Sequence, residues 1–254
     1  MKFYKGVVQY NGTSFFGWQK QPDQITIQGE LEKVVSRLNG NKEIQVIGSG
    51  RTDTAVHSIG QVFKITMPND FEESKLLKGM NGLLPEDIVV SSLERCDENF
   101  QPVFDAKSKT YKYYFSTSDV KSPHLRSLVT FLDYDVDLAL MNEACQQFVG
   151  EKDFVNFHTV GTPVKTTVRE IFSCEVEEVV SGEHSIYPDK TYVLIVTGSG
   201  FLKQMVRLIM SAIWAVGRER VGIEKLSMAF DTKLEQKVAA TAPPQGLYLY
   251  EVKY

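Results

Sequence analysis

The chain has 254 residues, of which 43% are hydrophobic, enough for one large domain or two of about 100 residues and too many for a disordered chain. The net charge of −4 at pH 7 gives no sign of a nucleic-acid partner and excludes none, because such binding depends on a local basic surface. The three cysteines lack metal-ligand spacing, which favours reduced thiols in a cytoplasmic protein.

The first hundred residues follow a strand–helix–strand–strand–helix–strand order. Residues 3–10 alternate as a strand, and apolar residues recur at helical spacing from Ile27 to Leu38, behind a plausible N-cap at Thr26. Further strands are expected at 43–47, 60–66 and 87–94, and a second helix at Leu76, Leu77 and Met80. This is the split βαβ pattern of ferredoxin-like domains. The N-terminus has no apolar signal-peptide core, so we expect no secretory signal.

The rest of the chain repeats the pattern after a seam near residues 98–108. Strands are expected at 109–116, 168–180, 190–197 and 246–254, and helices at Leu138 to Phe148, at 201–216 and, as an insertion, at about 219–239. The apolar stretch 201–216 is too short and too polar to span a bilayer. We therefore expect a soluble α+β protein built from two copies of one unit.

The stretch VIGSGRTDTAVHSIGQV, residues 46–62, puts charged side chains between two strand-like segments. Asp53 is either a capping or solvated loop acid, or a functional carboxylate at a strand end with Arg51 close by. The Gly-Ser-Gly turns at 48–50 and 198–200 complete no dinucleotide or phosphate-binding motif. Neither His57 nor the other histidines have ligand spacing, so we expect no metal.

The helix expected at 201–216 carries a narrow polar stripe of Lys203, Gln204, Arg207 and Ser211. The stripe faces either water or a polar cleft. In a cleft, Arg207 needs a carboxylate partner, because a buried unpaired arginine is very costly. Asp53 is one candidate.

The strand KSKTYKYYF places Lys107, Lys109, Tyr111 and Tyr113 on one face. This is either ordinary sheet pairing or an aromatic platform among cations, suited to a single-stranded or flipped nucleotide. A basic surface could be extended by Lys165, Arg169, Lys203, Arg218, Arg220 and Lys225.

Together these motifs resemble those of the tRNA pseudouridine synthase A (TruA-type) family. GSGRTDTAVHSIGQV is similar to the family's run Gly-Arg-Thr-Asp-Ala-Gly-Val-His-Ala, which ends in Gly-Gln-Val. Nearly the whole chain takes part, because further motifs match in the family's order: FFGWQKQP, TIQGELE, SKTYKYYF, DFVNF with TTVREI, GSGFLKQMVRLIM and APPQGLYL.

The resemblance implies two ferredoxin-like (split βαβ) halves, residues 1–105 and 106–254, with antiparallel sheets around a central cleft. It implies a cofactor-free cytoplasmic enzyme, usually a homodimer, that isomerises uridine to pseudouridine. The implied partner is tRNA and the implied targets are nucleotides 38 to 40 of its anticodon stem-loop. Another RNA, such as rRNA, is the alternative substrate.

The resemblance also implies roles for individual residues. Asp53 takes the place of the catalytic aspartate, Tyr111 that of the tyrosine against the target base, and Arg207 that of the arginine paired with the aspartate. Arg51 would hold the RNA and help to open the site of the stacked uridine. The implied substrate contacts also include Thr52, Lys109, Phe201, Lys203 and Leu247.

The chain departs from the family pattern near these residues. Thr54 and Ala55 replace Ala-Gly, and Ala55 would be strained if the position needs a positive φ. Ser58 replaces alanine, Leu208 stands where asparagine is common, and Ser211 where glycine is common. These departures bear on RNA recognition rather than on the three implied catalytic groups.

Two other function classes remain open from the sequence. One is a non-catalytic RNA-binding protein of the same architecture. The other is a small-molecule hydrolase that uses Asp53 and His57, for which loss of either residue would be equally damaging.

Overall fold

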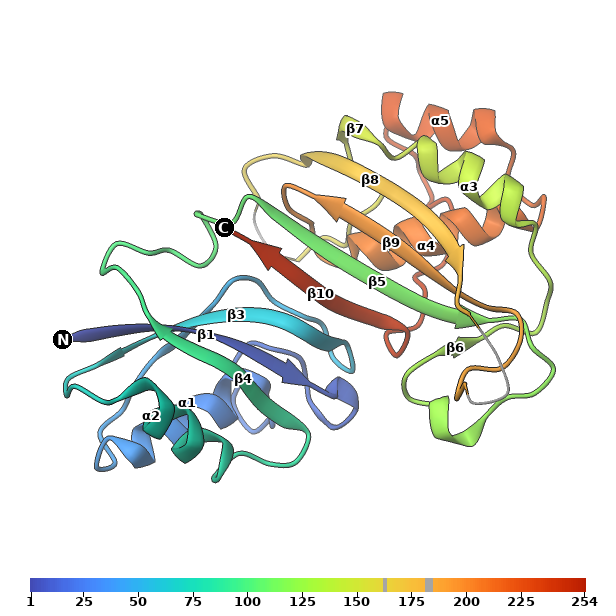
Figure 1. The fold of residues 1–254 in the computed structure, drawn as a ribbon. Coiled ribbons are helices and arrows are strands. Elements are labelled where there is room, and N and C mark those ends of the chain that lie inside the picture. The colour runs from blue at the N-terminus through green and yellow to red at the C-terminus, as the bar shows by residue number, and fades with distance from the viewer. Residues whose placement is uncertain (162–163, 181–184) are drawn as a thin grey trace. The chain divides into compact units, whose positions relative to one another are not determined.

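The structure is a computed structural model that describes residues 1–161, 164–180 and 185–254 (Figure 1). The chain divides into two compact units, one made of residues 1–107 with 248–254 and the other of residues 108–247. Both units mix helices and strands, which confirms the α+β class. The first seam lies close to the predicted one, but the last strand groups with the first unit, whereas the sequence placed it in the second. The central cleft stays a prediction.

The first unit has the predicted ferredoxin-like order. Its elements are β1 (Lys2–Tyr10), α1 (Ile27–Leu38), β2 (Val46–Gly48), β3 (His57–Met67), α2 (Glu73–Asn81), β4 (Ile88–Arg95) and the last strand, β10 (Leu247–Lys253). In space the strands run β4-β1-β3, with β2 and β10 also paired to β3. The pairs among β1 to β4 are antiparallel. β10 is parallel to β3, which departs from the purely antiparallel sheet that we predicted.

The helices α1 and α2 lie side by side on one face of this sheet (Figure 1). Their apolar faces pack against alternate residues of the strands, and the fully buried members include Tyr4, Val8, Ile27, Leu31, Val35, Phe63 and Met80. The predicted N-cap of α1 is confirmed, because the Thr26 hydroxyl accepts a hydrogen bond from the Gly29 N–H at 3.2 Å.

The second unit places α3, α4 and α5 on one face of its sheet (Figure 1). Its elements are β5 (Ser108–Ser116), β6 (Thr130–Phe131), α3 (Leu138–Gln146), β7 (Gly150–Asp153), β8 (Val168–Glu178), β9 (Thr191–Gly198), α4 (Met205–Gly217) and α5 (Ile223–Asp231). The strands run β5-β9-β8-β7 in antiparallel pairs, and β6 joins β5 in parallel. Trp214 anchors α4, with its ring edge-to-face to Tyr113 and Phe115 of β5 at 5.5 Å from each.

Helix α4 corrects the prediction of a polar stripe. The helix begins at Met205 rather than at residue 201, because Gln204 has a left-handed backbone with φ 59° and ψ 11°. Lys203 and Gln204 therefore precede the helix, and Ser211 is buried with its hydroxyl donating to the Leu208 carbonyl at 3.0 Å. α5 is likewise shorter than the predicted helix at 219–239.

No helix within the described ranges has the length and apolar character needed to cross a bilayer.

Candidate functional site

The loop that carries Asp53 connects β2 to β3 in the first unit. Ser49 anchors its start, because the Ser49 N–H donates to the Val62 carbonyl at 2.8 Å and the Ser49 hydroxyl to Gln61 Oε1 at 3.0 Å. The Gln61 amide in turn donates to the Gly50 carbonyl at 2.8 Å. These bonds attach the first half of the loop to β3.

A second segment, residues 11–18, is hydrogen-bonded to the other half of this loop, and we call this segment the clasp. The Trp18 N–H donates to the Thr52 carbonyl at 3.1 Å, and the Ala55 N–H donates to the Phe15 carbonyl at 3.3 Å. The hydroxyls of Tyr10 and Thr52 lie 2.9 Å apart in the interior. Gly17 has a φ of 83°, and a Cβ there would lie 2.6 Å from the Thr52 carbonyl oxygen, so only glycine allows this approach.

The clasp fixes the main chain on both sides of Asp53. Arg51 is exposed, Thr52 is buried and Asp53 is half-buried. The Val56 N–H also donates to the Asp53 carbonyl at 3.2 Å, which closes a short turn. Asp53 thus stands on a backbone held at several points, which suits a functional carboxylate better than a solvated loop acid. The sequence did not predict this role for residues 11–18, although its aromatic motif FFGW lies in this segment.

Ala55 has a φ of 61°, in the left-handed region. The sequence predicted strain at Ala55 if this position has a positive φ, because the related family has glycine here. For a residue with a Cβ this conformation costs about 1–2 kcal/mol. The strain lies two residues after Asp53 and is held in place by the Ala55–Phe15 hydrogen bond.

Replacing Ala55 with glycine is expected to raise the free energy of unfolding by about 0.5–1 kcal/mol, since glycine relieves the strain but has more conformational freedom to lose. Urea denaturation of both proteins measures the difference. Ala215→Gly, a substitution inside α4, is the control and is expected to lower stability by about 1 kcal/mol. Equal destabilisation by both variants would contradict the strain at Ala55.

His57 has a structural role in the first unit. It is only 1% exposed, and its Nδ1 accepts a hydrogen bond from the Gly12 N–H at 3.0 Å. Its ring stacks on Tyr248 at 4.6 Å. Because Nδ1 accepts, the neutral ring carries its proton on Nε2. With Nδ1 accepting from the main chain and Nε2 carrying the proton, the buried ring is not set up to take a proton as a general base, which argues against a hydrolase that uses Asp53 and His57 together.

In the second unit the structure brings Tyr111 and Phe201 together. Their rings meet edge-to-face at 4.9 Å and 74°. Both are half-buried, and Tyr111 lies on β5 opposite Val196 of β9. Lys109 shares this strand face, and desolvation by burial lowers the pKa of its ammonium. Tyr111 and Lys109 thus share the strand face that was predicted, and Phe201 packs against Tyr111, while the nucleotide platform stays a prediction.

Tyr113 does not belong to an open platform, which corrects the prediction. It is fully buried, and its hydroxyl bonds to Thr130 Oγ1 at 2.8 Å and to the Pro243 carbonyl at 2.7 Å. Burial raises the pKa of this hydroxyl, so it stays protonated. Tyr113 therefore packs the core next to Trp214.

Arg207 lies in the first turn of α4 and is held by the segment that precedes β10. Its Nε donates to the Ala242 carbonyl at 2.7 Å, and the Ala242 N–H donates back to the Arg207 carbonyl at 3.3 Å. The bond through Nε fixes the plane of the guanidinium, so its terminal amino groups have a set direction.

The remaining predicted substrate contacts differ in exposure. Lys203 is exposed, and its carbonyl accepts from the Thr159 N–H at 3.0 Å. Leu247 and Thr52 are buried, with 5% and 7% exposure. Asp53 belongs to the first unit, whereas Tyr111 and Arg207 belong to the second, so the pairing of Asp53 with Arg207 stays a prediction.

In the part of the chain that the structure describes, no group of three or more His, Cys, Asp or Glu side chains is placed to hold a metal ion.

Comparison with known proteins gives a consistent result over the whole chain. A family model described as tRNA pseudouridine synthase matches residues 7–105 and 144–254. Asp53 and Arg207 fall inside these matched ranges, whereas Tyr111 falls between them.

Curated relatives of this chain carry the name tRNA pseudouridine synthase A. The protein from Geobacillus sp. (strain WCH70) is 36% identical over 253 residues, which cover 100% of this chain and 98% of the relative. That from Streptococcus sanguinis (strain SK36) is 33% identical over 254 residues, covering 100% and 99%. That from Listeria monocytogenes (serovar 1/2a, strain EGD-e) is 32% identical over 255 residues, covering 100% of both chains.

Proposed function

This chain belongs to the tRNA pseudouridine synthase family, and from that premise we propose that the uridines it isomerises are nucleotides 38 to 40 of the tRNA anticodon stem-loop. The full-length similarity to proteins named tRNA pseudouridine synthase A supports the tRNA target. The observation that carries the proposed reaction is the hydrogen-bonded loop around Asp53, which lies inside the matched region. A carboxylate on such a loop suits chemistry on a base that has left its stack.

The reaction itself balances without an added reactant. The bond between C1′ of the ribose and N1 of uracil breaks, the base turns, and C1′ bonds to C5. The C5 proton leaves and N1 gains a proton, so nothing is oxidised or reduced. The target base must first leave its stack, at a cost of a few kcal/mol.

In the proposed mechanism Asp53, as an ionised carboxylate, acts as nucleophile or base. Arg207 stabilises the ionised form by pairing with it, which a planar and permanently charged group does well. Tyr111 covers the released uracil, supported from the side by Phe201. A closed, dry pocket would keep the free base from escaping.

The proposed substrate contacts are given different roles according to how exposed each side chain is. Arg51 and Lys203 are exposed and are proposed to contact phosphates, whereas Lys109 is half-buried and is proposed to lie beside the base. Thr52 and Leu247 are buried, so we assign them to shaping the site. The resemblance further supports a homodimer, and light scattering of the purified protein would test this oligomeric state. It also supports a cytoplasmic location.

Chemical mapping of pseudouridine tests the proposed target. Total RNA from cells with and without this protein is treated with a carbodiimide that marks pseudouridine and read by reverse transcription. We expect marks at tRNA nucleotides 38 to 40 to vanish without the protein and to return with the intact gene. If marks vanish only from rRNA, the proposed tRNA target is wrong and the substrate is rRNA, while the proposed reaction still holds. Unchanged marks in all RNA would contradict the proposed activity.

Affinity for tRNA is expected to fall steeply with salt despite the acidic composition, because contacts to phosphates release counterions. The logarithm of the association constant should fall linearly with the logarithm of salt concentration, by about 0.7–0.9 per phosphate contact. Lys203→Ala should reduce this slope by about one. Lys33→Ala, at an exposed residue paired with Glu30 on α1, is the control and should leave it unchanged. A flat response of the intact protein would contradict a basic RNA site.

A further inference from the structure

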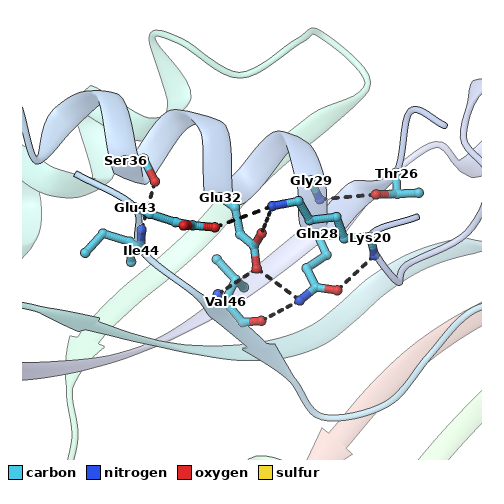
Figure 2. A network of polar contacts seen from close by, with 9 residues as sticks. All are labelled: Lys20, Thr26, Gln28, Gly29, Glu32, Ser36, Glu43, Ile44 and Val46. Atoms are coloured by element: carbon cyan, nitrogen blue, oxygen red, sulfur yellow. Dashed lines mark hydrogen bonds and ion pairs between the residues drawn. The ribbon is translucent and has the colours of Figure 1, made fainter. Parts of the chain in front are cut away.

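A buried carboxylate on α1 joins three segments of the first unit. Glu32 is only 7% exposed. Its Oε2 accepts from Lys20 Nζ at 3.0 Å, and its Oε1 accepts from Gln28 Nε2 at 3.1 Å and from the Val46 N–H at 3.2 Å (Figure 2). The three donors come from the segment after the clasp, from α1 itself and from the first residue of β2. Burying a carboxylate is costly, and here three donors offset that cost.

Gln28 completes the network between the same segments (Figure 2). Its Oε1 accepts from the Lys20 N–H at 3.0 Å, and its Nε2 also donates to the Val46 carbonyl at 3.0 Å. Its own N–H donates to the Trp18 carbonyl at 2.9 Å. Glu32 and Gln28 therefore hold both residues 18–20 and the start of β2.

The two segments so joined are the ones that flank the Asp53 loop. Trp18 holds the Thr52 carbonyl, next to Asp53, and β2 leads directly into the loop through Gly48. The segments also touch, since a Cβ on Gly48 would lie 2.5 Å from the Trp18 indole. Little space is left for one segment to shift against the other without moving the loop.

We propose that Glu32 is a positioning residue for Asp53, a role that rests on the proposed function. Its carboxylate sets the spacing between the clasp and β2, and through the Trp18–Thr52 hydrogen bond it sets the place of the carboxylate that reacts. It acts through these segments and does not touch the substrate.

The charge and the two equivalent oxygens of Glu32 are needed for this role. Glutamine has nearly the same shape but offers one acceptor oxygen and one N–H2 group. Because all three neighbours donate, the N–H2 group would face a donor at Lys20 or at Val46. The Glu32→Gln variant should therefore loosen the network while the apolar core of α1 stays in place.

The test compares Glu32→Gln with a matched control, Asn81→Ala. Asn81 also joins a helix to a strand in the first unit, donating to the Val90 carbonyl and accepting from the Val90 N–H, each at 2.8 Å. Both of these hydrogen bonds are made to β4, not to the clasp or to β2. For each variant we would measure the thermal midpoint, the tRNA dissociation constant, the single-turnover rate and the hydrogen exchange of the Trp18 and Ala55 amides.

For Glu32→Gln we expect a single-turnover rate about 10- to 100-fold lower, with tRNA affinity within about twofold. The Trp18 and Ala55 amides should exchange at least about tenfold faster, because both bonds to the Asp53 loop depend on the clasp. Asn81→Ala should lower the thermal midpoint about as much as Glu32→Gln does, but it should leave the single-turnover rate and the exchange of these two amides unchanged.

The outcomes separate this inference from the proposed function. An intact protein that forms no pseudouridine would overturn the function, while the exchange of the two amides would still report on the network. A Glu32→Gln variant with normal rate and normal exchange would overturn the positioning role alone. Equal losses of rate in both variants would reduce Glu32 to general stability and would also overturn it.

Discussion

The Asp53→Asn variant is expected to lose pseudouridine formation, with a rate at least about 10,000-fold below that of the intact protein. Asparagine keeps the shape of the side chain and the main-chain bonds of Thr52 and Val56, but it cannot act as nucleophile or base. Release of tritium from tRNA labelled at C5 of uridine measures the reaction directly, since that proton must leave.

The control for this experiment is Thr54→Ala. Thr54 is exposed and adjacent to Asp53, and alanine is the residue that the related family carries there. Its rate should stay within about twofold of the intact protein, and both variants should keep tRNA binding and thermal stability. Normal turnover by Asp53→Asn would remove the catalytic assignment. If the unmodified protein also forms no product but binds tRNA, the alternative of a non-catalytic RNA-binding protein is favoured over the enzyme.

Arg207→Lys is expected to lower the rate about 100-fold although the charge is kept. Arginine donates from Nε to the Ala242 carbonyl and still has two terminal amino groups with which to meet a carboxylate. A single lysine ammonium cannot hold Ala242 and pair with Asp53 in a fixed plane. The same tritium-release assay, run at saturating tRNA, measures the loss.

Arg126→Lys is the matched substitution, at an exposed arginine of the second unit, and should leave the rate unchanged. A second measurement keeps the prediction testable if folding is affected. The thermal midpoint and tRNA affinity of Arg207→Lys should stay close to those of the intact protein. Near-normal turnover would contradict the pairing of Arg207 with Asp53, and a collapsed fold would instead assign Arg207 to stability.

Short-range patterns explain which elements the sequence predicted well. The Thr26 cap and the spacing of apolar residues in α1 depend on neighbours within four positions, so both could be read directly. The start of α4 could not, because the left-handed backbone at Gln204 has no signal in the residue type. The grouping of β10 with the first unit is also a long-range choice, made through its parallel pairing with β3.

The same division applies to the candidate site. The motifs predict Asp53, Tyr111 and Arg207 as site residues, which stays a prediction, and the sequence also predicted that a positive φ at Ala55 would mean strain. It did not predict that Tyr113 is buried, since strand alternation puts it on the same face as Tyr111. Nor did it predict the Trp18–Thr52 bond or the Glu32 network, which join residues far apart in the chain.

By itself, then, the sequence determined the class of fold, the family and the side chains proposed for the chemistry, because these are carried by residue type and by local spacing. Only the tertiary structure decided what holds Asp53 in place and which aromatic residues stay accessible. Hydrogen bonds to the main chain and burial depend on which distant segments meet, and a linear pattern does not contain that information.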